Sequence, residues 1–206
     1  MALDGVTLFH IAQELKETLV GSSVDKIQQS NRFDLILSFR MRKSPKLLLS
    51  ANPSFPFCSI LDEKFDIPMQ APMFCMLLRK HLGNARLLDV FTEHYDRVIN
   101  FTFQTLDEFS DVKIRTLVFE LLGRHTNIIL LNEDNIILDS LVHVDHSKSR
   151  TREILPARPY QPIMPQEKPT PEDRLEGLSL ESLMALLQDG NPRMDKALLG
   201  LASGIS

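Results

Sequence analysis

The chain has 206 residues, of which 43% are hydrophobic and 24% are charged, so it is long enough to bury a substantial core and too apolar to be disordered throughout. Its 23 basic and 27 acidic residues give a net charge of -4, which excludes a protein that coats nucleic acid through overall positive charge; contacts with nucleic acid must come from a local patch. No apolar run reaches the roughly 18 residues of a membrane-spanning helix, and residues 1–8 lack a signal-peptide pattern, so we expect a cytoplasmic protein without membrane insertion.

The first predicted element is an amphipathic helix. Apolar residues recur with helical spacing from Leu8 to Leu19, and Gly21 ends the pattern. Asp4 lies just before this stripe, where its carboxylate can accept hydrogen bonds from the free amides of the first turn. Four short apolar runs follow, and they are predicted to be strands of an antiparallel sheet: residues 23–29, 34–41, 46–50 and 57–61.

A second helix is predicted over residues 72–83. Pro72 suits the first helical turn, an apolar stripe follows it, and Gly83 ends it. The methionines that flank this helix are predicted to pack rather than to form a recognition surface: Met69, Met73 and Met76.

From residue 85 onward the apolar period changes to two, which indicates strands. Residues 87–92 and 97–104 are predicted to form a hairpin with a turn over residues 93–96. By parity Arg97 falls on the apolar side of its strand, so its guanidinium needs a carboxylate partner, and Asp4 is a candidate. Further strands are predicted in three segments: residues 111–122, 127–131 and 135–142.

The sequence changes character at residue 145. Residues 145–171 combine several cations with several prolines, which is typical of a linker or of an arm that follows the surface. Helical spacing returns at residues 180–187 and 192–201. The complete pattern predicts an α+β protein, with an antiparallel β-rich lobe, packed helices and a helical C-terminal segment.

The sequence offers little for metal or cofactor chemistry. Cys58 and Cys75 are too few for a disulfide framework or a four-cysteine zinc site, and we expect them to be buried thiols. His143 and His146 flank Asp145 but have no further ligand at suitable spacing, so no metal site is predicted. No phosphate-binding loop, dinucleotide fingerprint or serine-hydrolase elbow is present, and we expect no cofactor.

Four sequence blocks together resemble one known family: ALDG (residues 2–5), LRKHL (78–82), YDR (95–97) and LGRHTNIIL (122–130). They are similar, in this order, to the NFACT family, which includes bacterial RqcH proteins, FbpA-like streptococcal fibronectin-binding proteins and the eukaryotic nuclear export mediator factor. The resemblance covers the whole chain. It implies an NFACT-N domain over residues 1–170, similar to the amino-terminal domain of formamidopyrimidine-DNA glycosylases, and the start of a helix-hairpin-helix region over residues 171–206.

The resemblance also implies a role in ribosome-associated quality control. There the full-length protein binds a large ribosomal subunit that carries a stalled peptidyl-tRNA, recruits alanyl-tRNA and supports the addition of an alanine tail without messenger RNA. The family residues linked to tailing fall on Asp4, Asp96 and Arg97 here. The family's coiled coils and NFACT-R domain are absent from this chain, so we expect no tailing by residues 1–206 alone.

We do not expect an enzyme. The chain begins with Met1 and Ala2, whereas glycosylases of this fold use an amino-terminal proline nucleophile beside a glutamate. DNA glycosylase activity is therefore not expected, in spite of the implied fold.

We interpret the three residues as a polar site for the tRNA anticodon arm, in which Asp4 holds the guanidinium of Arg97 and Asp96 faces outward. A planar guanidinium stacks on bases and donates hydrogen bonds in pairs, and a carboxylate accepts from base amino groups while it repels phosphate. The alternative is a helix cap, a turn aspartate and a structural ion pair. Seven cations are candidates for contacts with the RNA backbone, against the alternative of a solvated, salt-bridged surface: Arg79, Lys80, Arg86, Arg124, Lys148, Arg150 and Arg152.

A fibronectin-binding adhesin at the cell surface is the rival function, as the older family name implies. The sequence gives it little support, because display would need an export route without a signal peptide, and no repeat offers a strand to a fibronectin module.

Overall fold

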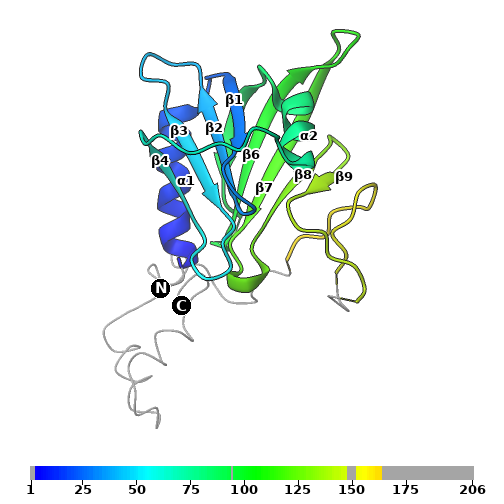
Figure 1. The fold of residues 1–206 in the computed structure, drawn as a ribbon. Coiled ribbons are helices and arrows are strands. Elements are labelled where there is room, and N and C mark those ends of the chain that lie inside the picture. Colours follow the sequence, from blue (N-terminus) through cyan, green and yellow to red (C-terminus); the bar gives the residue numbers. More distant parts are fainter. Residues whose placement is uncertain (1–2, 94, 148–151, 164–206) are drawn as a thin grey trace, which may run out of the picture.

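The computed structural model describes residues 3–93, 95–147 and 152–163. Two antiparallel sheets and two α-helices make up this part of the chain, which confirms the predicted α+β class (Figure 1). The elements are α1 (Gly5–Leu19), β1 (Val24–Gln29), β2 (Asp34–Phe39), β3 (Lys46–Ser50), β4 (Phe57–Leu61), α2 (Met73–Leu82), β5 (Arg86–Phe91), β6 (Val98–Leu106), β7 (Val112–Glu120), the 3-10 turn η1 (Gly123–His125), β8 (Asn127–Leu131) and β9 (Ile137–Ser140). Strands β1 to β4 form one sheet and β5 to β9 the other, each in sequence order.

The two sheets are joined at one corner, where the chain leaves α1 and enters β1. The Gly21 amide donates to the Leu87 carbonyl (2.8 Å), and the Leu87 amide donates to the Ser22 carbonyl (2.9 Å). These bonds satisfy backbone groups at the free edge of β5 and fix the start of β1 beside it.

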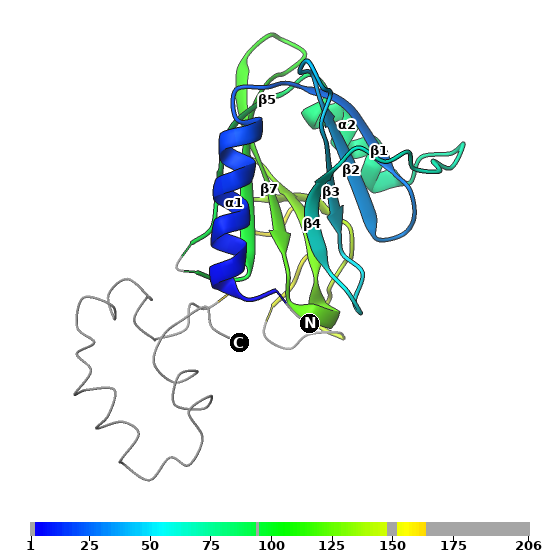
Figure 2. The same cartoon turned by 90° about the vertical axis from the view of Figure 1, so that its left-hand side faces the viewer.

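Helix α1 begins and ends as its sequence predicts. The Asp4 carboxylate accepts from the Thr7 amide at 2.8 Å, which is the capping bond expected before the apolar stripe. Leu8, Leu15 and Leu19 on that stripe are buried, and the helix packs on β5 and β6 (Figure 2). The helix therefore covers the β5–β6 part of one face of the five-stranded sheet.

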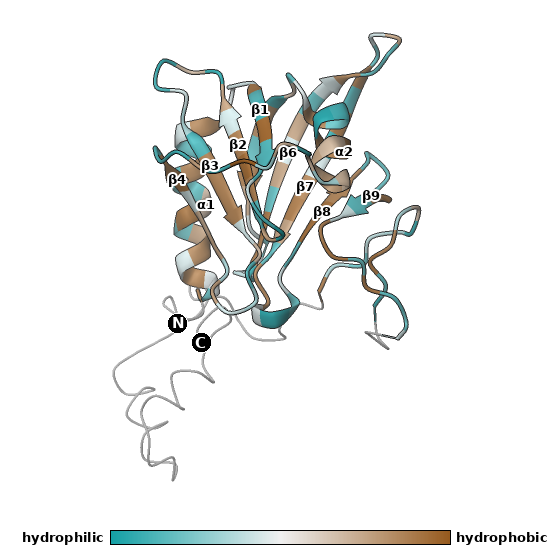
Figure 3. Cartoon of the chain, viewed as in Figure 1, coloured by the Kyte–Doolittle hydropathy of each residue, from teal (hydrophilic) through white to brown (hydrophobic). Residues whose placement is uncertain are grey.

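The main core lies between the two sheets and the helices. Ile99, Phe101 and Phe103 of β6 point into it and are fully buried, as their alternation predicts, and they meet residues such as Leu35 and Leu37 of β2. Hydrophobic residues line the strands of both sheets, while the connecting loops are mostly hydrophilic (Figure 3). The predicted thiols, Cys58 and Cys75, are also buried here, and burial raises the pKa of the Cys58 thiol to about 12.

Helix α2 turns one stripe to the core and ends at Gly83, where an added Cβ would lie 2.6 Å from the Arg79 carbonyl oxygen. The prediction that the neighbouring methionines pack in the interior is wrong. Phe74, Leu78 and the other buried residues of α2 lie on the side of the helix that faces the core, and the methionines do not. The exposed fractions of the three methionines are large: Met69 108%, Met73 85% and Met76 59%.

A second, smaller apolar cluster lies on the other face of the five-stranded sheet. Val118 and Ile129 of this face are covered by residues 152–163, which we call the arm. Ile154 of the arm exchanges two backbone hydrogen bonds with Val144, at 2.7 and 3.0 Å, and the Tyr160 amide donates to the chain before β9. The described part of the predicted linker is thus an arm that follows the surface.

Some expectations concern residues outside the described part of the chain. The helices predicted at 180–187 and 192–201, and the domain boundary after residue 170, lie there. No helix among residues 3–93, 95–147 and 152–163 is long and apolar enough to cross a membrane.

Candidate nucleic-acid interface

The start of α1 meets the turn between β5 and β6. The rings of Phe9 on α1 and Tyr95 in the turn contact each other, with centroids 4.8 Å apart and planes tilted by 41°. Asp4 precedes Phe9 by five residues, which is roughly 7.5 Å along a helix. The fold therefore brings the element that carries Asp4 to the turn that carries Asp96 and Arg97.

The turn itself is tightly built. The Asp96 amide donates to the Glu93 carbonyl at 2.8 Å, and the Arg97 carbonyl accepts from the Leu121 amide at 2.8 Å. Tyr95 has a φ of +56°, in the left-handed region that costs a bulky side chain about 1–2 kcal/mol. Such a strained conformation persists only where the surrounding contacts hold it in place. Here the contact with the Phe9 ring and the backbone hydrogen bonds of Asp96 and Arg97 hold Tyr95.

The predicted ion pair between Asp4 and Arg97 is not formed in the described part of the chain. The Asp4 carboxylate is occupied by the helix cap. Strand β6 begins at Val98, one residue later than predicted, so Arg97 lies at the strand end and is only partly buried. A guanidinium with access to water does not need a buried carboxylate partner.

A groove of about 400 Å³ runs between α1 and β5, close to this turn. Phe9, Gln13 and Lys16 line it from the helix, and Val90 and Thr92 line it from the strand. No sequence pattern predicts this groove, because two elements far apart in the chain form it. Phe9 could have indicated a contact surface here, since it is an aromatic residue beside the buried apolar stripe of α1 rather than on it.

A buried ion pair lies on the other side of the sheet. Glu120 at the end of β7 is 1% exposed, and its carboxylate accepts from the Arg152 guanidinium and from the Tyr160 hydroxyl, the latter at 2.8 Å. The guanidinium also stacks over the Tyr160 ring at 5.2 Å. Burial raises the pKa of Tyr160, and the neighbouring carboxylate of Glu120 raises it further.

This cluster ties the arm to the strands that hold the candidate site. Glu120 pairs with Val98 in the β6–β7 ladder, directly after Arg97. The structure thus gives Arg152 a structural role, as the counter-ion of a buried carboxylate, rather than the contact with RNA backbone that the sequence suggested. The sequence contained a sign of this pairing. Glu120 belongs to the apolar run of β7, and a buried carboxylate requires a cationic partner.

The other predicted cations do not form a single patch. Arg124 is exposed in η1, at the end of the sheet that holds the β5–β6 turn, and its guanidinium donates to His125 at 3.1 Å. Arg79, Lys80 and Arg86 lie at the opposite end of β5, which a six-residue strand places roughly 20 Å away. Lys148 and Arg150 fall outside the described residues.

The histidines that follow β9 each contact a carboxylate. His143 lies 2.6 Å from Asp139, and His146 lies 3.0 Å from Glu153. Across residues 3–93, 95–147 and 152–163, no group of three or more His, Cys, Asp or Glu side chains is placed to hold a metal ion.

Comparison with known proteins identifies the family. The family model for the NFACT N-terminal and middle domains matches residues 4–206. The chain belongs to the NFACT family. This confirms the resemblance drawn from the four sequence blocks.

Two curated NFACT relatives are Rqc2 homologs named RqcH. The chain is 35% identical to RqcH of Bacillus subtilis strain 168 over 208 residues, which covers 100% of this chain and 36% of that protein. It is also 35% identical to RqcH of Streptococcus pneumoniae strain D39 over 162 residues, which covers 78% of this chain and 29% of that protein. The chain therefore spans about a third of the length of these relatives.

Solved structures of the NFACT fold match the whole chain. The N-terminal domain of the fibronectin-binding protein PavA from Streptococcus pneumoniae superposes with a TM-score of 0.85 at 32% identity, covering 100% of this chain and 76% of that one. The N-terminal part of the fibronectin/fibrinogen-binding protein from Streptococcus suis gives a TM-score of 0.86 at 29% identity, with the same two coverages.

The cap at Asp4 gives a prediction that separates its structural role from a role in binding. Asp4→Ala should lower the free energy of unfolding by about 1 kcal/mol, because the Thr7 amide loses its acceptor. Asp4→Asn keeps an acceptor and should be nearly neutral. Urea denaturation of both variants measures the difference, and an equal loss in the two would show that the carboxylate charge, rather than the cap, stabilises the fold.

Proposed function

We propose that this NFACT domain is an RNA-binding module of a cytoplasmic ribosome quality-control factor, and that the β5–β6 turn engages the anticodon arm of alanyl-tRNA. The observation that carries the proposal is the strained, well-bonded turn that holds Asp96 and Arg97 beside the aromatic pair of Phe9 and Tyr95. The RqcH relatives support the quality-control assignment.

The chemistry of this end of the molecule suits single-stranded RNA. Unpaired bases in a tRNA loop are recognised by stacking on aromatic or guanidinium planes and by hydrogen bonds to base edges. Arg97 supplies the plane and paired donors, Asp96 supplies an acceptor, and the groove between α1 and β5 offers an aromatic wall in Phe9. The exposed cation of Arg124 lies at the same end and can approach phosphate.

The proposed role is binding rather than catalysis. In the full-length protein the domain would act on a large ribosomal subunit that carries a stalled peptidyl-tRNA, where bound alanyl-tRNA supplies the alanine tail. No cofactor is needed for such a role, and residues 1–206 alone would not extend a tail.

The test uses a full-length protein that carries this chain, with Asp96→Ala and Arg97→Ala made singly and together. Each variant should weaken capture of alanyl-tRNA by about tenfold or more, because a hydrogen bond to a charged group contributes roughly 1.5–3 kcal/mol. Glu108→Ala is the matched control, since Glu108 is an exposed acid on the β6–β7 turn, at the opposite end of β6. Unchanged capture and unchanged alanine tailing in the double variant would exclude this site.

A second candidate function follows from the solved relatives, which are named as fibronectin-binding and fibronectin/fibrinogen-binding proteins. In this reading the domain binds fibronectin at the cell surface. The same double variant separates the two functions: loss of fibronectin binding with alanyl-tRNA capture intact would favour the adhesin.

A further inference from the structure

Three apolar side chains lie exposed at the tip of the hairpin that β6 and β7 form (Figure 1). Phe109 in the turn is 85% exposed, and Leu106 and Val112 on either side of it are more than half exposed. Leu106 and Val112 pair directly across the ladder, so their side chains share one face of the hairpin. We call residues 106–112 the β6–β7 tip. An exposed aromatic residue gathered with two further apolar residues is typical of an interaction surface.

The apolar residues of the tip do not belong to the edge of a core. Val118 of the smaller apolar cluster lies on the same face of β7 as Val112. Between these two residues, however, Thr116 pairs with Thr102 of β6. A polar pair thus separates the tip from the cluster, and packing of the fold does not account for the exposed side chains.

The turn that carries Phe109 is held by its own hydrogen bonds. The Asp107 carboxylate accepts from the amides of Phe109 and Asp111, both at 2.9 Å. The Asp107 amide donates to the Asp111 carbonyl, and the Asp107 carbonyl accepts from the Ser110 amide, both at 3.0 Å. The backbone of the tip is therefore ordered before any partner binds, which lowers the entropic cost of docking.

The tip is also acidic. Lys113 lies 3.9 Å from the Asp107 carboxylate, so these two charges offset each other. Glu108 and Asp111 are exposed, and neither forms an ion pair in the part of the chain that the structure describes. Two carboxylates therefore flank Phe109. They repel the phosphates of RNA and anionic lipid headgroups, and they attract a cationic protein surface.

We propose that the β6–β7 tip docks into an apolar pocket, bordered by Lys or Arg side chains, on a partner protein. Phe109 is the anchor that fills the pocket, and Leu106 and Val112 exclude water around it, as in other interfaces with a central aromatic anchor. Glu108 and Asp111 pair with the cations at the border, which orients the docked tip. The tip lies at the opposite end of β6 from the β5–β6 turn, so the inference does not depend on the proposed binding of tRNA.

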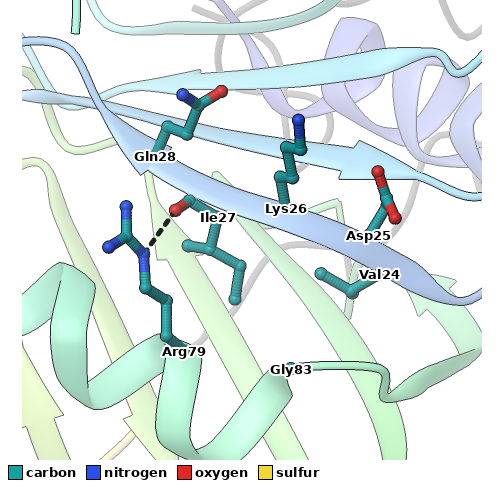
Figure 4. A pocket seen from close by; sticks show the side chains of 7 residues that line it. All are labelled: Val24, Asp25, Lys26, Ile27, Gln28, Arg79 and Gly83. Carbon is teal, nitrogen blue, oxygen red and sulfur yellow. Dashed lines mark hydrogen bonds between the residues drawn. The ribbon is translucent and has the colours of Figure 1, made fainter.

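A second copy of this chain fits the tip less well than a separate partner. The exposed side of α2 is apolar at Met73 and Met76 and carries Lys80 one turn later. Arg79 is directed toward β1 instead, where its Nε donates to the Ile27 carbonyl at 2.8 Å (Figure 4). The groove of about 310 Å³ at this point is lined by β1 and the C-terminal end of α2, and the two methionines lie outside it. This side of α2 is thus a convex helix surface rather than a pocket for an aromatic ring.

The first test places the photo-crosslinking residue benzoylphenylalanine at position 109 of the full-length protein, in the cells that produce it. We expect one predominant partner protein, with the cross-linked site in an apolar pocket bordered by Lys or Arg. Position 55 is the matched control, because Phe55 is also an exposed aromatic residue but lies on the β3–β4 loop of the other sheet. Cross-links to RNA, to lipid, to a second copy or within the same protein would overturn the proposal. The same products at both positions, or no product at position 109, would do so as well.

The second test measures binding of the purified partner by the full-length protein. Phe109→Ala should weaken binding about thirtyfold or more, which is the effect of truncating a central anchor, and Phe55→Ala should not. Glu108→Lys with Asp111→Lys should weaken binding about tenfold or more, and changing the bordering cations of the partner to Glu should restore it. Full binding by Phe109→Ala, or no restoration by the reversed charges, would contradict the proposed docking.

Neither set of substitutions should alter thermal unfolding, because the changed side chains are exposed. Capture of alanyl-tRNA should also stay unchanged, since it is assigned to Asp96 and Arg97 at the other end of β6. A loss of stability or of alanyl-tRNA capture in Phe109→Ala would show that the tip supports the fold or the tRNA site, and would overturn its assignment to a separate partner.

Discussion

Replacing Arg152 with Ala should lower the free energy of unfolding by about 3–5 kcal/mol, because it leaves the carboxylate of Glu120 buried without its cation. Glu120 is 1% exposed, and its carboxylate would keep the hydrogen bond from the Tyr160 hydroxyl. Guanidinium chloride denaturation measures the loss. The arm should also become sensitive to protease, since the ion pair and the Ile154 contacts hold it on the sheet.

Arg158→Ala is the matched control for this prediction. Arg158 belongs to the same arm, but its side chain is 61% exposed and lies 3.5 Å from Glu153, so we expect a loss below about 1 kcal/mol. Adding Glu120→Gln to Arg152→Ala removes the unpaired charge and should recover part of the stability. Similar losses for Arg152→Ala and Arg158→Ala would mean that the buried pair contributes no more than an exposed one.

Phe101→Ala should cost about 3–5 kcal/mol as well, but for a different reason. Phe101 is fully buried at the centre of β6, and truncation removes its transfer free energy and leaves a cavity between the sheets. Thr102→Ala, one residue along the same strand, faces the other side of the sheet and should cost less than about 1 kcal/mol. Thermal or denaturant unfolding of the two variants is the measurement, and comparable losses would contradict the assignment of β6 faces.

Local patterns predicted most of the described fold. The stripe from Leu8 to Leu19 and the cap at Asp4 identified α1, and the alternation of Ile99, Phe101 and Phe103 identified the buried face of β6. These patterns succeed because each records the period of one element and the side that it buries. Strand ends were less accurate, and the one-residue error at the start of β6 was enough to misplace Arg97.

Contacts between distant segments could not be predicted in the same way. The pairing of Glu120 with Arg152 joins β7 to an arm about thirty residues later, and periodicity says nothing of which cation meets a buried acid. The methionines around α2 were misjudged because an apolar side chain at a helix start can face either way. The distribution of cations over two ends of the fold likewise depends on how the sheets are joined, which no single segment records.

The candidate site came from the family resemblance rather than from physical patterns. Asp96 and Arg97 stand in a short polar turn that, taken alone, is an ordinary hairpin connection. The structure adds what the sequence did not contain, namely the contact of Tyr95 with Phe9 and the left-handed backbone at Tyr95.

The bond from Arg79 to Ile27 also bears on how the chain avoids self-association. Strand β1 is one of the two edge strands of its sheet, and an unprotected edge strand is a template on which a neighbouring molecule can add a strand and start an aggregate. Arg79 occupies a carbonyl in the middle of that strand, and α2 packs against it. The side-chain donor and the helix therefore leave less of the edge of β1 open for pairing with a further strand.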